Sequence, residues 1–321
     1  MTKLIIQIPC FNEEKALPVT LKELPRKLPG VSKIEWLIID DGSSDRTVEV
    51  ARELGVDHVV HLIRHQGLAK GFMAGLQACV ELGADVIVNT DADNQYYAGD
   101  IPKLIQPILD GKAEIVVGAR PISEIKHFSP LKKLFQKLGS WVVRRISQTD
   151  IEDAPSGFRA ISREAAMRMH VFSEYTYTIE TIIQAGQKGM AIVSVPVRTN
   201  DFLRKSRLIH SIPAYLTRSF NTIMRIFMTY QPMEFFRIPA MIFFSLGTIL
   251  GLRFLYFVVF TGNSSGHIQS LILAAVLLIL GGMFFVFGLL ADLISVNRKL
   301  LENVEYRIQR LDEKIEKNNK K

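Results

Sequence analysis

Two aspartates, Asp91 and Asp93, follow directly on the apolar residues 86–88 and are separated by a single alanine. A β-branched strand that ends in this way brings both carboxylates to the carboxyl edge of a sheet, where open α/β sheets bind ligands. Two such oxygen donors suit a divalent cation, which commonly holds a diphosphate at the same time. Because aspartate is also frequent in turns, a plain turn is the alternative for this pair taken alone.

Three more polar loops precede this pair, and each follows a short apolar segment. The apolar segments are residues 4–8, 36–39 and 59–63, and the polar loops are residues 9–14, 40–45 and 64–71. The repeated order of strand, polar loop and helix predicts a parallel sheet with crossover helices. Since the carboxyl ends of parallel strands share one edge, all four loops are expected to meet there.

The composition indicates contact with a membrane. The chain has 321 residues, a net charge of +7, a pI of about 9.3 and a mean hydropathy of +0.17. This length suggests one domain with an appendage. Basic charge beside apolar segments favours an anionic membrane surface, and no nucleic-acid-binding motif accompanies it. Two cysteines, Cys10 and Cys79, predict no disulfide framework, and residues 4–8 are too short for the apolar part of a signal peptide.

Two apolar segments in the C-terminal third, residues 238–261 and 268–291, are each long enough to cross a bilayer. The connection between them contains no Lys or Arg, whereas the outer flanks are basic. The positive-inside rule therefore predicts an external loop and cytosolic termini. Two buried core helices are the alternative, which this length disfavours. Arg253 interrupts the first segment; it can snorkel, face the other helix or meet a lipid phosphate, and the sequence leaves these options open.

Residues 131–146 and 212–228 combine apolar side chains at helical spacing with Lys and Arg, which predicts helices in the headgroup layer. Ordinary helices packed on the core are the alternative. The charged tail at 299–321 carries apolar residues at a-and-d spacing over about two heptads, too few to predict a coiled coil. Homo-oligomerisation is left as an open hypothesis. The apolar residues of the tail are Leu301, Val304, Ile308, Leu311 and Ile315.

Five ordered motifs make the chain similar to the family 2 glycosyltransferases, which have the GT-A fold. They are Pro9-Cys10-Phe11-Asn12-Glu13, Asp40-Asp41-Gly42-Ser43, Asp91-Ala92-Asp93, Gly118-Ala119-Arg120 and Ser156-Gly157-Phe158-Arg159. The chain looks most like the polyprenyl-phosphate (dolichol-phosphate) group of that family, because a membrane hairpin follows. The resemblance covers about two-thirds of the chain, and His65-Gln66 departs from it.

The resemblance implies a division of the chain into four parts. A GT-A (Rossmann-like) α/β catalytic domain occupies residues 1–210 and includes the interfacial helix at about 130–146. A juxtamembrane amphipathic helix at 211–235, two transmembrane helices at 236–296 and a charged cytosolic helix or tail at 297–321 follow. The implied enzyme is an integral membrane protein with a cytosolic catalytic domain.

The resemblance also implies a donor site for a UDP- or GDP-linked sugar with Mg²⁺ or Mn²⁺. A metal bridging carboxylate and diphosphate stabilises the charge that builds on the leaving group. Asp93 and the side-chain carbonyl oxygen of Gln95 are the expected metal ligands. Asp91 is expected to contact sugar or ribose hydroxyls or the metal. Asp40 or Asp41 is expected to accept hydrogen bonds from the base or ribose. The remaining donor-binding residues are Pro9, Phe11, Glu13, Lys70 and Ala92.

The implied acceptor is a polyprenyl phosphate, and transfer to it inverts the anomeric carbon. A lipid phosphate is already an anionic nucleophile and needs cations to position it, and Arg suits bidentate phosphate contact. A base is needed only for a hydroxyl acceptor, and Glu180 is left open as such a base or as a residue that orients one of the cations. The expected acceptor-phosphate residues are Arg120, Arg159, Arg204, Ser206 and Arg207, with Asp91, Asp93 and Arg120 as the catalytic set.

Other functions fit the sequence less well. A glycolipid synthase acting on a diacylglycerol-type hydroxyl is the main alternative, and a non-catalytic nucleotide-binding membrane scaffold is a second. A processive polysaccharide synthase lacks support because the only tryptophans, Trp36 and Trp141, do not form its Gln-x-x-Arg-Trp motif. A dinucleotide oxidoreductase is disfavoured because no G-x-G-x-x-G follows the first strand.

Overall fold

The computed structural model describes residues 2–121, 130–171, 177–200, 220–221, 224–225, 227–261 and 268–319. The chain forms two compact units. The first contains Met1–Ile223 with Ile308–Lys321, and the second contains Met224–Arg307.

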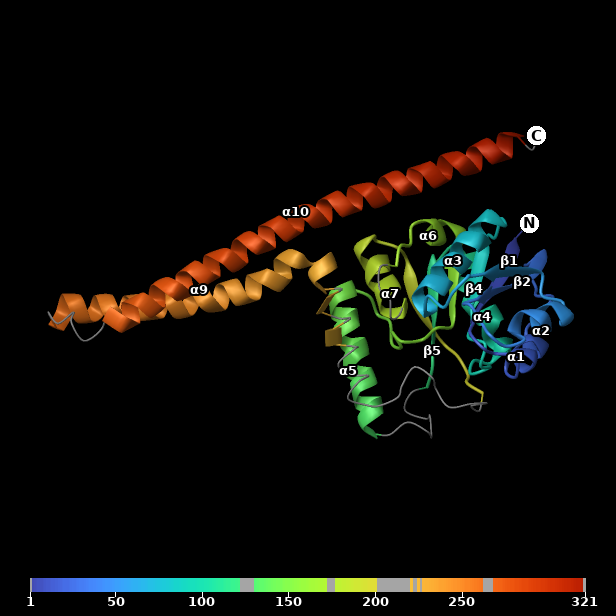
Figure 1. Ribbon diagram of the computed structural model, residues 1–321, viewed down its shortest axis with the longest axis horizontal. Coiled ribbons are helices and arrows are strands. Elements are labelled where there is room, and N and C mark those ends of the chain that lie inside the picture. Colours follow the sequence, from blue (N-terminus) through green and yellow to red (C-terminus); the bar gives the residue numbers. More distant parts are fainter. Residues whose placement is uncertain are drawn as a thin grey trace. The chain divides into compact units, whose positions relative to one another are not determined.

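One seven-stranded sheet organises the first unit, in the order β3-β2-β1-β4-β6-β5-β7 (Figure 1). The strands are β1 (Lys3–Cys10), β2 (Lys33–Asp40), β3 (His58–His61), β4 (Val86–Asn89), β5 (Ile115–Ala119), β6 (Arg159–Ser162) and β7 (Ile192–Pro196). The first four strands are parallel to one another, and β5 is parallel to β7. β6 runs antiparallel to both of its neighbours, β4 and β5. The parallel arrangement predicted for the first four strands is confirmed, and the whole sheet is mixed because of β6.

The register brings the predicted loops to one edge. Cys10 at the end of β1 is level with Asp40 at the end of β2, and Asp40 is level with His61 at the end of β3. Because β6 is antiparallel, the loop before it, not the loop after it, reaches this edge: Arg159 at the start of β6 pairs with Asn89 at the end of β4. The convergence of the loops after β1 to β4 is confirmed, and residues 154–158 join them.

Helices cover both faces of the sheet. One face is covered by α1 (Leu17–Glu23), α2 (Thr47–Glu53), η1 (Ala98–Asp100) and α4 (Ile101–Leu109). The other face is covered by α3 (Leu68–Glu81), α6 (Arg163–Met167) and α7 (Thr178–Gln187). A further helix, α5 (Pro130–Ser147), packs against α7. Successive strand residues point to opposite faces, so Leu4, Ile6 and Ile8 enter the core with α1 and α4. Since both faces are covered, the strands read as continuous apolar runs in the sequence.

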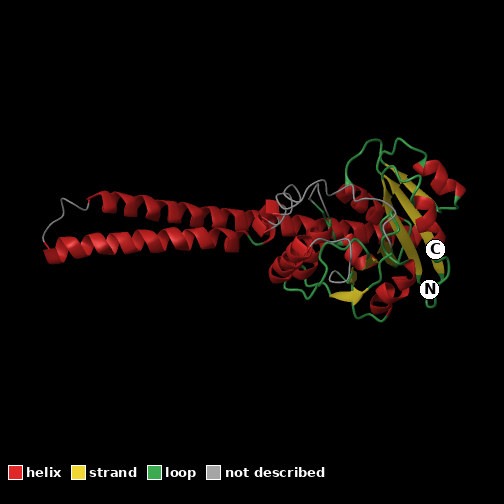
Figure 2. Ribbon diagram, turned by 90° about the horizontal axis from the view of Figure 1, so that it is seen from below, coloured by secondary structure: helices red, strands yellow, loops and turns green. Residues whose placement is uncertain are grey.

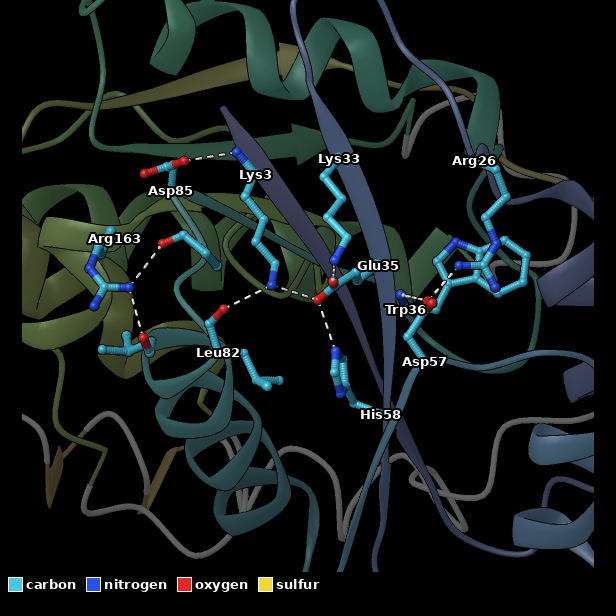
Figure 3. A network of polar contacts seen from close by, with 12 residues as sticks. Lys3, Arg26, Lys33, Glu35, Trp36, Asp57, His58, Leu82, Asp85 and Arg163 are labelled. Atoms are coloured by element: carbon cyan, nitrogen blue, oxygen red, sulfur yellow. Dashed lines mark hydrogen bonds and ion pairs between the residues drawn. The ribbon is translucent and has the colours of Figure 1, made fainter. Parts of the chain in front are cut away.

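A charge cluster joins the amino-terminal ends of β1, β2 and β3, at the edge opposite the loops (Figure 3). The Glu35 carboxylate lies 2.7 Å from Lys3 Nζ, 2.5 Å from Lys33 Nζ and 2.8 Å from His58 Nε2. Burial alone would raise the pKa of Glu35, but the hydrogen bonds from Lys3, Lys33 and His58 outweigh it and lower the pKa to about 2. Glu35 therefore stabilises the fold away from the site.

Glu35→Gln is expected to lower the free energy of unfolding at pH 7 by on the order of 2 kcal/mol, because Lys3, Lys33 and His58 lose their shared carboxylate. The folded-state pKa lies below the unfolded value, so the carboxylate stabilises the fold above about pH 4.5 and loses this effect as the pH falls toward 2. Denaturant unfolding of the full chain in detergent at pH 7 and pH 3 measures this.

The matched control is Glu53→Gln, since Glu53 pairs with Arg46 at the surface, where both side chains are more than half exposed. This control should change stability by less than about 0.5 kcal/mol. An equal effect of the two variants, or a Glu35→Gln effect that persists at pH 2, would contradict the assignment.

The second unit contains two long helices. They are α9 (Pro232–Tyr256), which continues as the π-helical η2 (Phe257–Thr261), and α10 (Ile268–Asn319), of which the part up to Arg307 belongs to this unit. They lie side by side in both views (Figures 1 and 2). Small residues allow the close approach: a methyl group added at Gly247 would lie 2.9 Å from Leu278, and one at Gly281 would lie 3.1 Å from Phe244. Both helices are long and apolar enough to cross a membrane.

Candidate active site

The loop after β4 holds the two aspartates in a fixed backbone. Thr20 Oγ1 donates a hydrogen bond to the Ala92 carbonyl at 2.7 Å, and the Asn200 N–H donates to the Gln95 carbonyl at 2.9 Å. The Gln95 N–H donates to Asp93 Oδ1 at 3.2 Å. Burial alternates along the loop, so that Ala92 is buried while the oxygen-bearing side chains of Asp91, Asp93 and Gln95 are half-buried.

These oxygen donors fit a cation that is shared with a substrate. Among the residues that the structure describes, no group of three or more His, Cys, Asp or Glu side chains could hold a metal ion. A cation beside Asp91 and Asp93 would thus have at most two carboxylates from the described residues and would take its other ligands from the Gln95 side chain, water or a diphosphate. Mg²⁺ is usually bound in this way. The site fits a cation bound together with a diphosphate and does not fit a closed protein cage.

An aromatic pair lies at the ends of β1 and β3. The Phe11 ring stacks on the His65 imidazole, with 4.1 Å between centroids and 26° between planes. His65 Nδ1 lies 2.8 Å from Asp41 Oδ2. The Asp41 carboxylate also accepts hydrogen bonds from the N–H groups of Gln66 at 2.7 Å and Gly67 at 2.9 Å. Asp41 thereby fixes the loop after β3 and holds His65 against Phe11.

Asp40 differs from its neighbour in having no exposed surface, so that, of the expected Asp40 or Asp41, Asp41 is left for the base or ribose. Its side chain is fully buried, its Oδ1 accepts from the Ser43 N–H at 3.2 Å, and its Oδ2 lies 2.7 Å from His61 Nδ1. An aspartate without exposed surface cannot meet a base or ribose directly, so Asp40 fixes the loop instead. The remaining expected donor residues vary in accessibility: Pro9 and Phe11 are half-buried, Glu13 is buried, and Lys70 is exposed in the first turn of α3.

Arg120, at the end of β5, forms a buried ion pair that the sequence did not reveal. Its Nε lies 2.6 Å from Asp153 Oδ2 and its Nη2 lies 3.0 Å from Asp153 Oδ1. The two side chains are 8% and 1% exposed. The guanidinium also lies over the Tyr96 ring, 5.9 Å from its centroid. In the sequence, Asp153 could have been singled out only by its position three residues before the Ser156-Gly157-Phe158-Arg159 motif.

Gly157 brings the loop before β6 close to Asp91. A methyl group added at Gly157 would lie 3.1 Å from Asp91 Oδ1 and 3.0 Å from the Tyr177 hydroxyl. Asn89 Nδ2 donates to the Gly157 carbonyl at 2.8 Å and to the Tyr177 hydroxyl at 2.9 Å. Burial, followed by the charge of Asp91, raises the pKa of Tyr177 well above its ordinary value, so its hydroxyl stays protonated. Sequence reasoning missed Asn89 and Tyr177.

Arg159 lies in the interior, which corrects its expected role at the acceptor phosphate. Its side chain is 1% exposed; Nε donates to the Ser156 carbonyl at 2.8 Å, Nη2 donates to the Ala154 carbonyl at 2.9 Å, and Nη1 donates to Thr181 Oγ1. Burial lowers the pKa of Arg159 to about 10. Arg159 therefore ties the loop before β6 to α7.

Other predicted residues fall elsewhere. Arg204, Ser206 and Arg207 lie outside the described residues, as does most of the predicted helix at 212–228. Glu180, on α7, is 2% exposed. The helix predicted at 131–146 is present as α5, and in its described part Trp141 is 56% exposed.

Comparison with known proteins assigns the fold and the family. The family model described as glycosyl transferase family 2 matches residues 5–175. A UDP-N-acetylglucosamine–dolichyl-phosphate N-acetylglucosaminyltransferase from Methanococcus voltae is 33% identical over 217 residues, 60% of this chain and 83% of that protein. A polyprenol monophosphomannose synthase from Mycolicibacterium smegmatis is 26% identical over 204 residues, 60% of this chain and 76% of that protein.

A solved structure shows the same fold. Glucosyl-3-phosphoglycerate synthase from Mycobacterium tuberculosis, in complex with Mn²⁺, uridine diphosphate and glucosyl-3-phosphoglycerate, has a TM-score of 0.55 and 18% identity; the match covers 71% of this chain and 80% of that chain. At this identity the likeness shows the fold alone, and it agrees with the predicted GT-A domain. The family match extends over more than half of the 321 residues. The chain is therefore a glycosyltransferase that belongs to glycosyl transferase family 2.

Proposed function

We propose that this glycosyltransferase moves a sugar from a UDP- or GDP-linked donor to a polyprenyl or dolichyl phosphate at a membrane. The observation that carries the proposal is that the Asp91–Asp93 loop, the Phe11–His65 pair and Arg120 follow strands that end at one edge of the sheet. The same chain has two helices long enough to cross a membrane. The names of the two relatives, which act on dolichyl phosphate and as a polyprenol monophosphomannose synthase, support this acceptor.

The donor half of the site would hold the nucleotide diphosphate. Asp93, Gln95 and Asp91 would hold Mg²⁺ or Mn²⁺, which when bound neutralises the diphosphate leaving group as a Lewis acid. The Phe11–His65 pair offers a flat surface of the kind on which a nucleobase stacks. Pro9, Glu13, Asp41, Lys70 and Ala92 complete the proposed donor-binding set.

The acceptor half suits a phosphate better than a hydroxyl. A hydroxyl must lose its proton to a positioned base, and Glu180, the base considered from the sequence, is buried in α7. A lipid phosphate needs positive charge, and Arg120 at the end of β5 is the proposed source, with its pair to Asp153 fixing the position of the guanidinium. Arg204, Ser206 and Arg207 are proposed from the sequence as further contacts. One in-line displacement by the phosphate oxygen would invert the anomeric carbon.

The two long helices would anchor the enzyme beside its lipid acceptor. We propose that α9 and α10 span the bilayer with the catalytic domain in the cytosol, because the basic flanks Arg237 and Lys299 lie on one side of the hairpin. Loop residues 262–267 lie outside the described residues. Arg253 is exposed on α9, with its guanidinium 5.8 Å from the Phe257 ring centroid.

The decisive experiment offers the purified full chain UDP- and GDP-sugars with a polyprenyl phosphate, in Mn²⁺, Mg²⁺ or EDTA. We expect one donor to give a lipid-phosphate-linked monosaccharide in metal and no product in EDTA. The matched acceptors are the same polyprenol without phosphate and a diacylglycerol, and both should be inert. Efficient use of the diacylglycerol would favour a glycolipid synthase. Donor binding without turnover on any acceptor would favour a non-catalytic scaffold.

A further inference from the structure

The C-terminal part of α10 carries an exposed apolar stripe. Its members recur at alternating intervals of three and four residues, and each is between 53% and 70% exposed: Leu301, Val304, Ile308, Leu311 and Ile315. This spacing is that of the a and d positions of a coiled coil. The uncharged part of α10 ends at Ala291, and Asp292, Arg298 and Lys299 follow it, so the stripe lies beyond the segment suited to a bilayer core. Apolar side chains gathered in water indicate a surface that another molecule covers.

The residue types along the stripe favour two strands. Leu301, Ile308 and Ile315 take the a positions, while Val304 and Leu311 take the d positions. Ile308, Leu311 and Ile315 have the β-branched a and leucine d residues that favour a parallel dimer, whereas Leu301 and Val304 reverse this order. The chain's own packing uses another face of α10. Ser295 and Glu302, at b positions, are 5% and 7% exposed, and Ser295 Oγ donates to the Thr229 carbonyl at 3.4 Å.

The charges beside the stripe specify its direction. Glu305 and Asp312 occupy e positions, and Arg307 occupies the g position between them. In a parallel pair, a g residue faces the e residue five positions further along the other copy, so Arg307 meets Asp312 twice in each dimer. An antiparallel pair would place e residues opposite e residues, with like charges together. A helix lying on an anionic bilayer would instead carry basic residues along both sides of its apolar face.

We propose that residues 301–315 form a parallel two-stranded coiled coil with the same segment of a second copy of this chain. The protein is then a homodimer joined through α10. Two copies anchored in one bilayer have a raised effective concentration, which allows a coil of about two heptads to form. The choice of sugar donor and lipid acceptor has no bearing on this interface.

Cysteine cross-linking of the full chain in membranes tests the interface. Ile308→Cys and Leu311→Cys place a thiol at an a and a d position, and Asn303→Cys places one at an exposed c position as the matched control. The native Cys10 and Cys79 are buried and stay in place. Mild oxidation should give disulfide-linked dimers at 308 and 311 with at least about fivefold higher yield than at 303. Equal yields at all three positions, or none at 308 and 311, would overturn the proposal.

The direction is tested by charge reversal and by mixed cross-linking. Arg307→Glu or Asp312→Arg alone should lower the yield at Ile308→Cys about fivefold, and the double reversal should restore it while sugar transfer is unchanged. If the single reversals lower the cross-linking yield and the double reversal does not restore it, Arg307 and Asp312 do not pair. In membranes containing both Leu301→Cys and Ile315→Cys chains, each should link to its own kind. A 301–315 cross-link would show an antiparallel pair instead.

Discussion

Replacing Asp93 with alanine is expected to reduce sugar transfer by about a thousandfold or more. A metal ion on the diphosphate would supply several kcal/mol of charge stabilisation to the transition state, and this variant removes the carboxylate proposed as its principal ligand. The fold should persist, since Asp93 is half-buried and accepts its hydrogen bond from the adjacent Gln95 N–H. Transfer of radiolabelled sugar, measured over a range of Mn²⁺ concentrations, gives kcat and the metal requirement together.

Two comparisons make this result specific. Gln95→Ala should lose less activity, because a neutral amide oxygen attracts a cation less than a carboxylate does. Asp110→Ala is the control for removal of a loop carboxylate, since Asp110 follows α4 and pairs with Lys112 at 2.9 Å. Wild-type turnover of Asp93→Ala in EDTA would exclude Asp93 as a metal ligand.

Arg120→Ala is expected to weaken both the fold and the use of the acceptor. The variant leaves Asp153, which is 1% exposed, without its guanidinium partner, and breaking a buried pair in this way costs about 3–5 kcal/mol of stability. A charge-assisted phosphate contact contributes about 1.5–3 kcal/mol, so kcat/KM for the lipid phosphate should fall ten- to a hundredfold. The donor KM should change little. Unfolding and steady-state kinetics on the same preparation separate the two effects.

Arg26→Ala provides the matched control, because Arg26 also pairs with an aspartate, Asp57, but at the edge that carries Glu35 (Figure 3). Its removal should leave acceptor kinetics unchanged. Arg120→Lys should recover only part of the acceptor kcat/KM, because lysine keeps the charge but not the two-pronged geometry. Loss of stability with an unchanged acceptor KM and kcat would make Arg120 a structural residue and move the acceptor site elsewhere.

The sequence was sufficient for the first four strands and the edge they share. Each strand is a covered apolar run followed by a polar loop, a local pattern that does not depend on the rest of the fold. Their ends shifted by a few residues: β1 is Lys3–Cys10, where residues 4–8 were predicted, and β3 is His58–His61, where 59–63 were predicted. The antiparallel direction of β6 could not be predicted, because the types of its four residues do not indicate which strands it pairs with or in which direction.

Contacts between distant segments account for the other differences. Asp40 and Asp41 are neighbours in sequence, yet the Asp40 side chain is buried and pairs with His61, whereas the Asp41 side chain accepts hydrogen bonds from the loop after β3. Arginine is rarely buried, so the sequence favoured an exposed Arg159; three hydrogen bonds compensate its burial in this fold. The Arg120–Asp153 pair joins residues 33 positions apart, which no local spacing predicts.

The order of the elements along the chain has a consequence for biosynthesis. The last strand of the sheet, β7, ends at Pro196, and the first membrane-length helix, α9, begins at Pro232. Ribosomes add about 5–20 residues per second, so the intervening stretch of about 35 residues takes roughly 2–7 s to translate. Mixed α/β domains of simple topology fold within milliseconds to seconds. If α9 spans the bilayer as proposed, the nascent catalytic domain has time to acquire its complete sheet before α9 is available to the insertion machinery.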